Sequence, residues 1–349
     1  MPRVAIVGAG SFGTALACAA RRAGLATRIW AREPEVAEAI NAGRGNPLFL
    51  PGIALEGGIE ATSDLKACLA EADFVLLAVP AQFLRGVAER MRPIIPAGLP
   101  VISCSKGIES GSCALMPEVI AAALPQAAIG VLAGPSFAKE LALGLPTGVT
   151  LASADLAMAE RLARTLASAR FRVYASDDPV SATIGGAYKN VLAIACGIAI
   201  ARRLGENARG LLIARGLHEM ASLARAKGGN PINLLGLAGS GDVTLTCMGT
   251  QSRNTTFGIA LGEGRAPADI LAERKAVTEG VPTAAAISEL GRRLGLVLPI
   301  ACAVDRVVNQ GASIEAVMAE LLAMPAGVEL ADLAAATRTG PRPASRPPD

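Results

Sequence analysis

The chain has 349 residues, a formal net charge of +3, and hydrophobic residues at 52% of its positions but aromatic residues at only 3%. This length allows two domains that each bury a core, and the nearly balanced charge, without a dense basic block between aromatic residues, argues against a nucleic-acid partner. The seven cysteines are scattered and have no CxxC or cysteine–histidine spacing, so the sequence predicts reduced thiols and no metal site.

The first predicted element is an apolar run at residues 4–7 that leads directly into the glycine-rich segment GAGSFG at residues 8–13. An apolar run before a glycine turn is typical of a buried parallel strand, and the residues that follow have the composition of a closely packed helix. In a dinucleotide-binding turn of this GxGxxG spacing, Gly8 permits the tight turn and Gly10 lets the backbone approach a pyrophosphate. Gly13 allows the helix, whose N-terminus faces the anion, to lie close to the strand.

The second predicted strand, residues 26–30, is not followed by the acidic residue that commonly binds a ribose 2′-hydroxyl about twenty residues past the glycines. Arg32 stands near that place. An arginine there can accommodate a 2′-phosphate, so we expect NADPH to be used at least as well as NADH. Glu33 could still serve the hydroxyl if the turn is shifted by one residue. An irregular loop that ends near Gly58 follows the next helix, and long loops beside a cofactor cleft are often functional.

Three further buried strands are predicted at residues 73–80, 100–104 and 128–132. The second runs into Ser105-Lys106-Gly107, and the third runs into AGPSFA at residues 133–138. Because ligands in open α/β sheets bind at the carboxyl ends of the strands, we expect both segments at the same cleft. Two more strands, with a helix between them, complete the strand-rich half at residues 147–152 and 171–175.

The composition changes after residue 178, where strand-like runs stop and Ala, Leu, Arg and Glu recur at helical spacing to about Ala336. We therefore predict a Rossmann-like α/β domain with a mostly parallel sheet at residues 1–178 and an all-α domain at residues 179–336. Residues 337–349 combine four prolines with three arginines and almost no apolar side chains, which predicts a disordered tail.

The longest apolar span, residues 191–200, has about half the length that a bilayer requires. It is flanked by Lys189 and Arg202-Arg203, so it is predicted to be a core helix and not a membrane span. The opening residues lack the basic segment and longer apolar stretch of a secretory signal. We therefore expect a cytoplasmic protein that is not integral to a membrane.

Residues 185–191, GGAYKNV, place Lys189 inside an otherwise apolar helix. A desolvated lysine has a lowered pKa and can exchange protons near neutrality. The alternative is a lysine whose charged end reaches solvent from a helix end. The only histidine, His218, lies in a helical pattern far from any glycine turn and is expected to pack rather than to catalyse. We therefore interpret Lys189 as the candidate acid and base for a hydride transfer.

A second group of polar residues comprises GSGD at residues 239–242 and the run Ser252-Arg253-Asn254. That run is typical of a helix opening, where backbone N–H groups and a guanidinium together make an anion site. A phosphate fits this chemistry, and Lys106 offers a second cation across the cleft. The alternative is an ordinary helix cap, Ser252 or Asn254, beside a solvated arginine.

These motifs together resemble those of the bacterial-type NAD(P)-dependent glycerol-3-phosphate dehydrogenases. The resemblance runs from Gly8 to about Ala336 and rests on the glycine turn, Ser105-Lys106-Gly107, GPSFA at 134–138, YKNV at 188–191, GSGD at 239–242 and Ser252-Arg253-Asn254. It implies a Rossmann-like N-terminal domain, an all-helical C-terminal domain and NADP or NAD as cofactor. The implied activity interconverts dihydroxyacetone phosphate and sn-glycerol 3-phosphate, a precursor for phospholipid synthesis.

The resemblance also implies roles for individual residues. Lys189 would accept the proton in the oxidative direction. Substrate contacts would be Lys106, Gly134, Ser136, Lys189, Asp242, Ser252, Arg253 and Asn254. Besides Gly8, Gly10 and Gly13, cofactor contacts would be Ser11, Phe12, Arg32, Lys106, Ala138, Arg253, Val277 and Glu279. The match around Val277 and Glu279 is the loosest.

Two other functions stay open at the level of the sequence. A β-hydroxyacid dehydrogenase would share the glycine turn and a lysine followed by asparagine, but would need a carboxylate site where Ser252-Arg253-Asn254 suits a phosphate. A non-catalytic dinucleotide sensor would keep the glycines without a proton donor, and Lys189 together with Asp242 argues against it. The sequence leaves the oligomeric state open, a homodimer included.

Overall fold

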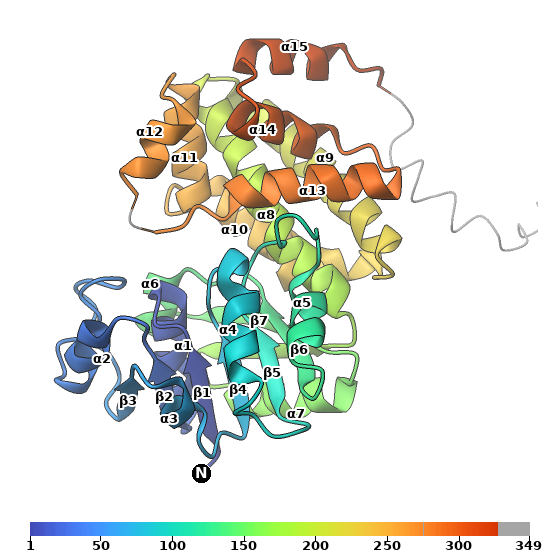
Figure 1. The fold of residues 1–349 in the computed structure, drawn as a ribbon. Coiled ribbons are helices and arrows are strands. Elements are labelled where there is room, and N and C mark those ends of the chain that lie inside the picture. The colour runs from blue at the N-terminus through green and yellow to red at the C-terminus, as the bar shows by residue number, and fades with distance from the viewer. Residues whose placement is uncertain (275, 327–349) are drawn as a thin grey trace, which may run out of the picture.

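An eight-stranded sheet forms the centre of the N-terminal half (Figure 1). The computed structural model describes residues 1–274 and 276–326. The strand order is β3-β2-β1-β4-β5-β6-β7-β8, and all neighbours are parallel except β6 and β7. The strands are β1 (Arg3–Val7), β2 (Ala26–Trp30), β3 (Ile59–Thr62), β4 (Phe74–Leu77), β5 (Pro100–Ser103), β6 (Ala128–Ala133), β7 (Thr147–Ala152) and β8 (Phe171–Ser176). The predicted mostly parallel sheet is confirmed.

Helices cover both faces of this sheet, which explains its continuous apolar runs. One face packs against α1, α6 and α7 through residues such as Leu16, Leu141 and Leu162. The other packs against α3, α4 and α5. The helices of this half are α1 (Ser11–Arg22), α2 (Pro34–Asn41), α3 (Leu65–Leu69), η1 (Ala81–Phe83), α4 (Leu84–Met91), α5 (Met116–Ala123), α6 (Ala138–Ala142) and α7 (Leu156–Leu166).

Strand β3 was not predicted. It has only four residues, Ile59–Thr62, and lies at the edge of the sheet beside β2. Its sequence Ile-Glu-Ala-Thr carries a charge and follows two glycines, so it gave no apolar run to separate it from the preceding loop.

The C-terminal half is helical, as expected, over the residues that the structure describes; residues 327–336, which were also predicted to belong to it, lie outside them. Its helices are α8 (Pro179–Ala201), α9 (Gly205–Ala226), η2 (Pro231–Leu235), η3 (Leu237–Gly241), α10 (Asp242–Met248), α11 (Arg253–Gly262), α12 (Pro267–Ala272), α13 (Gly280–Leu294), α14 (Pro299–Asn309) and α15 (Ile314–Ala323). The last strand ends at Ser176 and α8 begins at Pro179. The predicted tail, residues 337–349, lies outside the described residues.

Helix α8 runs through the middle of this half and is surrounded by α9, α10, α11 and α13 (Figure 1). By length and composition alone it could cross a membrane, with a mean hydropathy of 1.5, but 83% of its most apolar window is buried inside the protein. It forms the centre of the main helical core, which is the position predicted for residues 191–200.

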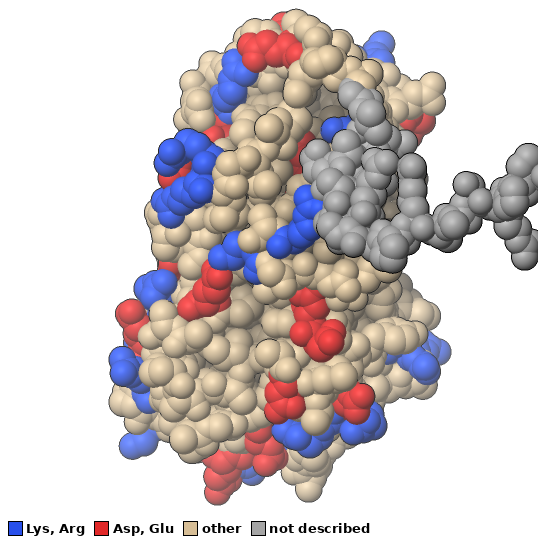
Figure 2. Space-filling model, turned by 90° about the vertical axis from the view of Figure 1, so that its right-hand side faces the viewer, with Lys and Arg blue, Asp and Glu red and all other residues tan. Residues whose placement is uncertain are grey.

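The helical half sits over the carboxyl ends of the parallel strands (Figure 1). Two side-chain hydrogen bonds join the two halves at this edge. Glu279 accepts one from the backbone N–H of Ala81, after β4, and Lys106, after β5, donates one to Asp242. Acidic and basic side chains are interspersed over both halves on the face that Figure 2 shows. The strand ends and the helical half therefore meet where ligands bind in open α/β sheets.

Helices α8 and α11 cross at two glycines. A Cβ at Gly197 would lie 2.2 Å from the backbone oxygen of Thr255, and a Cβ at Gly258 would lie 2.1 Å from the backbone oxygen of Ile194. Both distances are far below any normal van der Waals contact. The crossing therefore depends on glycine at both positions, and it holds the first turn of α11 close to α8.

We expect Gly197→Ala to lower the free energy of unfolding by about 1–3 kcal/mol, because the added methyl group forces the two helices apart. Urea unfolding of the parent and the variant measures the change. Gly210→Ala is the matched control, since it is exposed on α9 and its Cβ would meet no atom within 4 Å. Equal or greater stability of Gly197→Ala would show that the crossing does not depend on glycine.

Candidate active site

The glycine turn has the geometry that its spacing predicts. Gly8 has φ +115°, and a Cβ there would lie 2.6 Å from the backbone oxygen of Ala78 at the end of β4. A Cβ at Gly13 would lie 1.9 Å from the backbone oxygen of Gly8. At Gly10 a Cβ would meet no atom within 4 Å, so the space in front of the turn is open. The turn and the N-terminus of α1 therefore fit a dinucleotide pyrophosphate.

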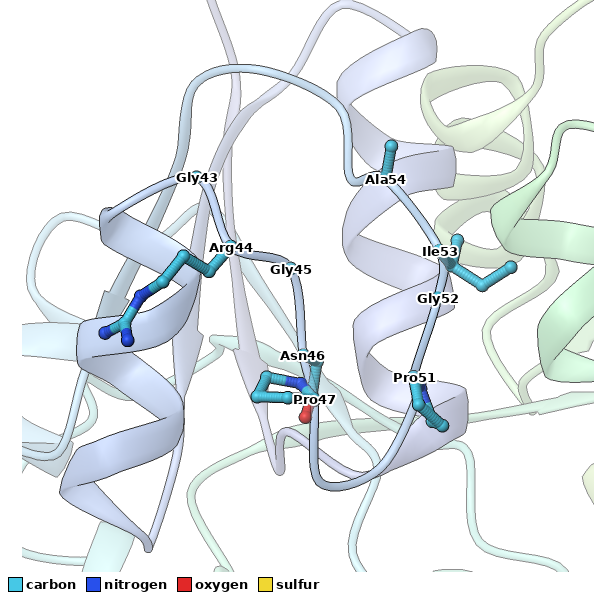
Figure 3. Close-up of a pocket in the computed structure, with 9 residues that line it drawn as sticks. All are labelled: Gly43, Arg44, Gly45, Asn46, Pro47, Pro51, Gly52, Ile53 and Ala54. Atoms are coloured by element: carbon cyan, nitrogen blue, oxygen red, sulfur yellow. The ribbon is translucent and has the colours of Figure 1, made fainter.

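The loop between α2 and β3 is fixed to this turn by a buried side chain. Asn46 is 1% exposed, and its Nδ2 donates hydrogen bonds of 2.8 Å to the backbone oxygen of Ala9 and to Oγ1 of Thr14. Figure 3 shows the loop folded back on itself, with the Arg44 side chain directed away from the space it encloses. That cavity of about 290 Å³ is lined by Gly43, Arg44, Gly45, Asn46, Pro47, Pro51, Gly52, Ile53 and Ala54.

Arg32 lies two residues after the end of β2, and its side chain is 73% exposed. Its guanidinium forms an ion pair of 2.6 Å with Oε1 of Glu33. The two residues considered for cofactor choice are therefore adjacent in space as well as in sequence. An exposed arginine can exchange this weak surface pair for a stronger phosphate contact.

We expect Arg32→Ala to raise KM for NADPH by about tenfold to a hundredfold, since a hydrogen-bonded charge contributes roughly 1.5–3 kcal/mol. KM for NADH should change little. Steady-state kinetics with each cofactor measures the difference, with Arg44→Ala as a control whose side chain is directed away from the loop cavity (Figure 3). Equal losses with both cofactors would remove Arg32 from this role.

Two lysines share one buried carboxylate at the junction of the two halves. Asp242, the first residue of α10, is 0% exposed, and Lys189 on α8 is 6% exposed. Oδ1 of Asp242 accepts a hydrogen bond from Nζ of Lys189, and Oδ2 accepts one of 2.9 Å from Nζ of Lys106. Nζ of Lys189 also donates to Oγ1 of Thr246 at 3.0 Å. The predicted burial of Lys189 is therefore seen, together with its partner.

Lys106 extends this cluster to the end of β6. Its Nζ donates to the backbone oxygen of Gly134 at 2.8 Å and to Oγ of Ser136 at 3.2 Å. It also lies 5.4 Å from the centroid of the Phe12 ring, in the first turn of α1. Lys106 therefore connects the predicted substrate residues with the dinucleotide-binding turn.

The pKa of Lys189 is lowered to about 8. Burial lowers it most, and the positive charge of Lys106 lowers it further, whereas the carboxylate of Asp242 raises it. An amine with this pKa is present in both protonation states near neutral pH. It can therefore give and take a proton at low cost.

The start of α11 is joined to the cluster through Asn190, the residue after Lys189. Nδ2 of Asn190 donates to the backbone oxygen of Lys106 at 2.8 Å, and its Oδ1 accepts from Nδ2 of Asn254 at 2.9 Å. Ser252 is the N-cap of α11, since its Oγ accepts from the backbone N–H of Thr255 at 3.2 Å. Of the two predicted caps, Ser252 is therefore the one that caps α11, while Asn254 belongs to the network around Lys106.

Arg253 is exposed at the start of α11. A second arginine, Arg274, lies beside it and donates from Nη1 to the backbone oxygen of Arg253 at 2.6 Å. Arg274 is not among the predicted site residues, because it is 21 residues away from Arg253 and belongs to no motif. Two guanidinium groups therefore lie at the first turn of α11, that of Arg253 on the helix and that of Arg274 from the segment after α12, together with the positive end of the helix dipole.

Glu279 lies where the helical half meets the end of β4. Its Oε1 accepts a hydrogen bond of 3.1 Å from the backbone N–H of Ala81. Burial raises its pKa, and the N–H of Ala81 and the charge of Arg253 oppose this rise. Within the described residues its buried Oε2 has no hydrogen-bond partner, and neither has Oγ1 of Thr283. Both atoms lie beside Gly107, where a Cβ would be 3.1 Å from Oε2 of Glu279 and 3.2 Å from Oγ1 of Thr283.

Two predicted cofactor residues lie at the margin of this arrangement. Ala138 begins α6 and packs against the core beside α1. Val277 precedes α13 and is 38% exposed. For both residues, contact with the cofactor stays a prediction.

The seven cysteines are free thiols, and six of them are buried. Across residues 1–274 and 276–326, no three His, Cys, Asp or Glu side chains lie together in a group that could hold a metal ion.

Two family models match the chain. Residues 3–159 match the NAD-dependent glycerol-3-phosphate dehydrogenase N-terminus, and residues 178–319 match the C-terminus of the same family. The chain belongs to the NAD-dependent glycerol-3-phosphate dehydrogenase family. The resemblance inferred from the motifs is therefore confirmed.

Other members of the glycerol-3-phosphate dehydrogenase family align with most of the chain. A glycerol-3-phosphate dehydrogenase (NAD(P)+) of Rhodospirillum rubrum is 49% identical over 326 residues, which is 93% of each chain. One of Paramagnetospirillum magneticum is 56% identical over 257 residues, 74% of this chain and 93% of that one. The crystal structure of glycerol-3-phosphate dehydrogenase from Coxiella burnetii superposes with a TM-score of 0.88 at 37% identity, over 93% of this chain and 99% of that one.

Proposed function

We propose that the protein interconverts dihydroxyacetone phosphate and sn-glycerol 3-phosphate, with NADP or NAD as the hydride carrier. The observation that carries this proposal is the buried cluster in which Lys189 and Lys106 share Asp242 beside the glycine turn. It combines an adjustable proton donor with a dinucleotide site, in a chain whose family is NAD-dependent.

The dinucleotide would lie across the carboxyl ends of the first strands. Its pyrophosphate would contact the open backbone at Gly10, and Arg32 would lie toward its adenosine ribose. When bound, the dinucleotide supplies the hydride for reduction and accepts it in oxidation. The residues proposed to hold it are Gly8, Gly10, Ser11, Phe12, Gly13, Arg32, Lys106, Ala138, Arg253, Val277 and Glu279.

The substrate would lie between the lysine cluster and α11. Its phosphate would be bound by the first turn of α11, where Arg253 is exposed and free to form a two-pronged contact. Ser252 and Asn254 have their side chains in hydrogen bonds within the protein, so they would shape this turn. The residues proposed to contact the substrate are Lys106, Gly134, Ser136, Lys189, Asp242, Ser252, Arg253 and Asn254.

Lys189 would move the proton. In reduction its ammonium gives a proton to the carbonyl oxygen of dihydroxyacetone phosphate, and in oxidation its neutral amine takes the proton from the hydroxyl group. Asp242 offsets one of the two positive charges of the lysines, and it keeps the pKa of Lys189 from falling further. Oγ1 of Thr246 fixes the direction of Nζ. These contacts hold the proton donor in one place between reaction cycles.

The test compares substrates in one spectrophotometric assay. Purified protein should oxidise NADPH when dihydroxyacetone phosphate is added, and it should be inactive with a 3-oxo acid of similar size that lacks a phosphate. Activity with the 3-oxo acid alone would favour a β-hydroxyacid dehydrogenase. Binding of NADPH without turnover of either substrate would favour a dinucleotide sensor.

We also propose a boundary at residue 178 between a dinucleotide-binding unit, residues 1–178, and a second unit, residues 179–336, which is helical over its described residues. The change from β8 to α8 at this point supports it. Free thiols throughout the chain fit a reducing cytoplasm, and the product would serve phospholipid synthesis there. Analytical ultracentrifugation would test whether the protein is a homodimer.

A further inference from the structure

A buried tyrosine directly precedes Lys189 on α8. Tyr188 is 0% exposed, and its hydroxyl donates a hydrogen bond to Oε2 of Glu219 on α9, which is 3% exposed. Oε1 of Glu219 accepts from the backbone N–H of Ile300 at 2.8 Å, and Oε2 accepts from that of Ala301 at 3.2 Å. One carboxylate therefore joins α8, α9 and the N-terminus of α14.

This carboxylate lies inside the main apolar core of the helical half, where burial is costly. Burial raises the pKa of Glu219 to about 7, although three hydrogen bonds favour its charged form. A pair of well-packed apolar side chains would fill the same space without this cost. Hydrogen bonds are directional and apolar contacts are not, so this arrangement can fix the orientation of the helices that it joins.

Three consecutive residues of α8 reach three different parts of the structure. Tyr188 donates to Glu219 on α9, Lys189 donates to Asp242 on α10, and Asn190 donates to the backbone oxygen of Lys106 after β5. Because the side chains of neighbouring helical residues point about 100° apart, these bonds hold the same turn from different sides. Together they fix the rotation and the height of α8 at Lys189.

Loss of the Tyr188 bond would leave that side of the turn with apolar contacts only. Such contacts permit small rotations and shifts of one helix against another. Nζ of Lys189 would then lose its fixed position between Asp242 and Thr246. A displacement of about 1 Å in a catalytic group can cost roughly a hundredfold in rate.

We propose that Tyr188 and Glu219 are positioning residues for Lys189, acting through a tether from α8 to α9 and α14. The proposal rests on the proposed function of Lys189. Neither residue contacts the reacting atoms, and each acts by holding α8 in register.

Tyr188→Phe removes only the hydroxyl and tests the tether directly. We expect kcat with dihydroxyacetone phosphate to fall about tenfold to a hundredfold, with the affinity for NADPH unchanged. Tyr174→Phe is the matched control, because Tyr174 is the other tyrosine of the chain and is 55% exposed on β8. Its kcat should equal that of the parent.

Glu219→Gln weakens the tether from the other end and keeps the volume of the side chain, because a single amide oxygen cannot accept from Tyr188 and from both backbone N–H groups of α14. If the two residues act through one bond, the double variant should lose no more kcat than Tyr188→Phe alone. If Tyr188→Phe does not fold, the same measurements are made on Glu219→Gln. Losses that multiply in the double variant would contradict a shared tether.

The pKa of Lys189 gives a readout that is independent of turnover. It is measured by NMR of protein that is labelled with 13C at the lysine Cε. We expect Tyr188→Phe to lower the pKa of Lys189 from about 8. A looser contact with the carboxylate of Asp242 would stabilise the charged ammonium form less. An unchanged pKa and a kcat within twofold of the parent, with reduced thermal stability, would overturn the proposal and leave a purely structural role. If the parent does not use dihydroxyacetone phosphate, the proposed function fails, and the pKa alone then decides for or against the tether.

Discussion

Lys189→Ala should lower kcat by about a hundred- to ten-thousand-fold, the usual contribution of a positioned general acid. The amine of Lys189 is buried against Asp242 and Thr246. The alanine side chain that replaces it has no group that can donate a proton. The affinity for NADPH should be retained, because the glycine turn lies in the other half of the chain. Steady-state turnover and cofactor titration of the same preparation measure both quantities.

Lys189→Arg is the informative companion, since guanidinium stays protonated and cannot give and take a proton in each cycle. It should remain inactive although the positive charge is kept. Lys227→Ala is the control, because Lys227, at the end of α9, forms its ion pair with Glu118 on α5 and not with Asp242. A Lys189→Ala variant within tenfold of the parent would mean that another group, or solvent, supplies the proton.

The pH dependence of the parent follows from the same residue. The pKa of Lys189 is about 8, and in the proposed mechanism reduction requires its protonated form. The kcat for reduction should therefore be full below about pH 8 and fall as the pH rises through that value. The kcat for oxidation, which requires the neutral amine, should rise over the same interval. Both dependences should disappear in Lys189→Ala.

Arg253→Ala should lower kcat/KM for dihydroxyacetone phosphate by about a hundredfold or more, equivalent to roughly 3 kcal/mol for a bidentate, charge-assisted contact. The exposed side chain leaves the fold intact when it is removed. Arg253→Lys should restore activity only in part, because an ammonium cannot form the two parallel hydrogen bonds. Kinetic constants for all three proteins, with circular dichroism as a check of folding, measure the effect.

The matched control for Arg253 is Arg265→Ala. Arg265 follows α11 and is paired with Glu273 on the surface, so its loss should leave the kinetic constants unchanged. If Arg253→Ala kept the KM and kcat of the parent, the phosphate would be bound elsewhere. Arg274, which hydrogen-bonds the backbone of Arg253, would be the next residue to test.

Local patterns were sufficient to predict most of the fold. The apolar run before Gly8 and the glycine spacing give a strand, a turn and a helix in consecutive residues, so no distant contact is needed to recognise them. The end of strand-like runs near Asp178 likewise separates the two halves. The antiparallel direction of β7 was not predictable, because strand direction depends on the path of the connection and not on composition.

The site was predictable only where its residues belong to motifs. Lys189 stands out as a charge in an apolar helix, and the structure gives it a buried partner in Asp242. That Lys106 shares the same carboxylate depends on contacts across 136 residues of sequence. Glu219 and Arg274 carry no local signal, since each acquires its neighbours through the packing of helices that are distant in sequence.

The most direct test of the proposed reaction follows the hydride itself. NADPH with deuterium at the transferable C4 position is incubated with the protein and dihydroxyacetone phosphate, and the product is examined by mass spectrometry and by a stereospecific assay. We predict sn-glycerol 3-phosphate with one deuterium at C2. Product without deuterium, deuterium at another carbon, or no phosphorylated product at all would contradict a dehydrogenase that reduces this substrate at the Lys189 cluster.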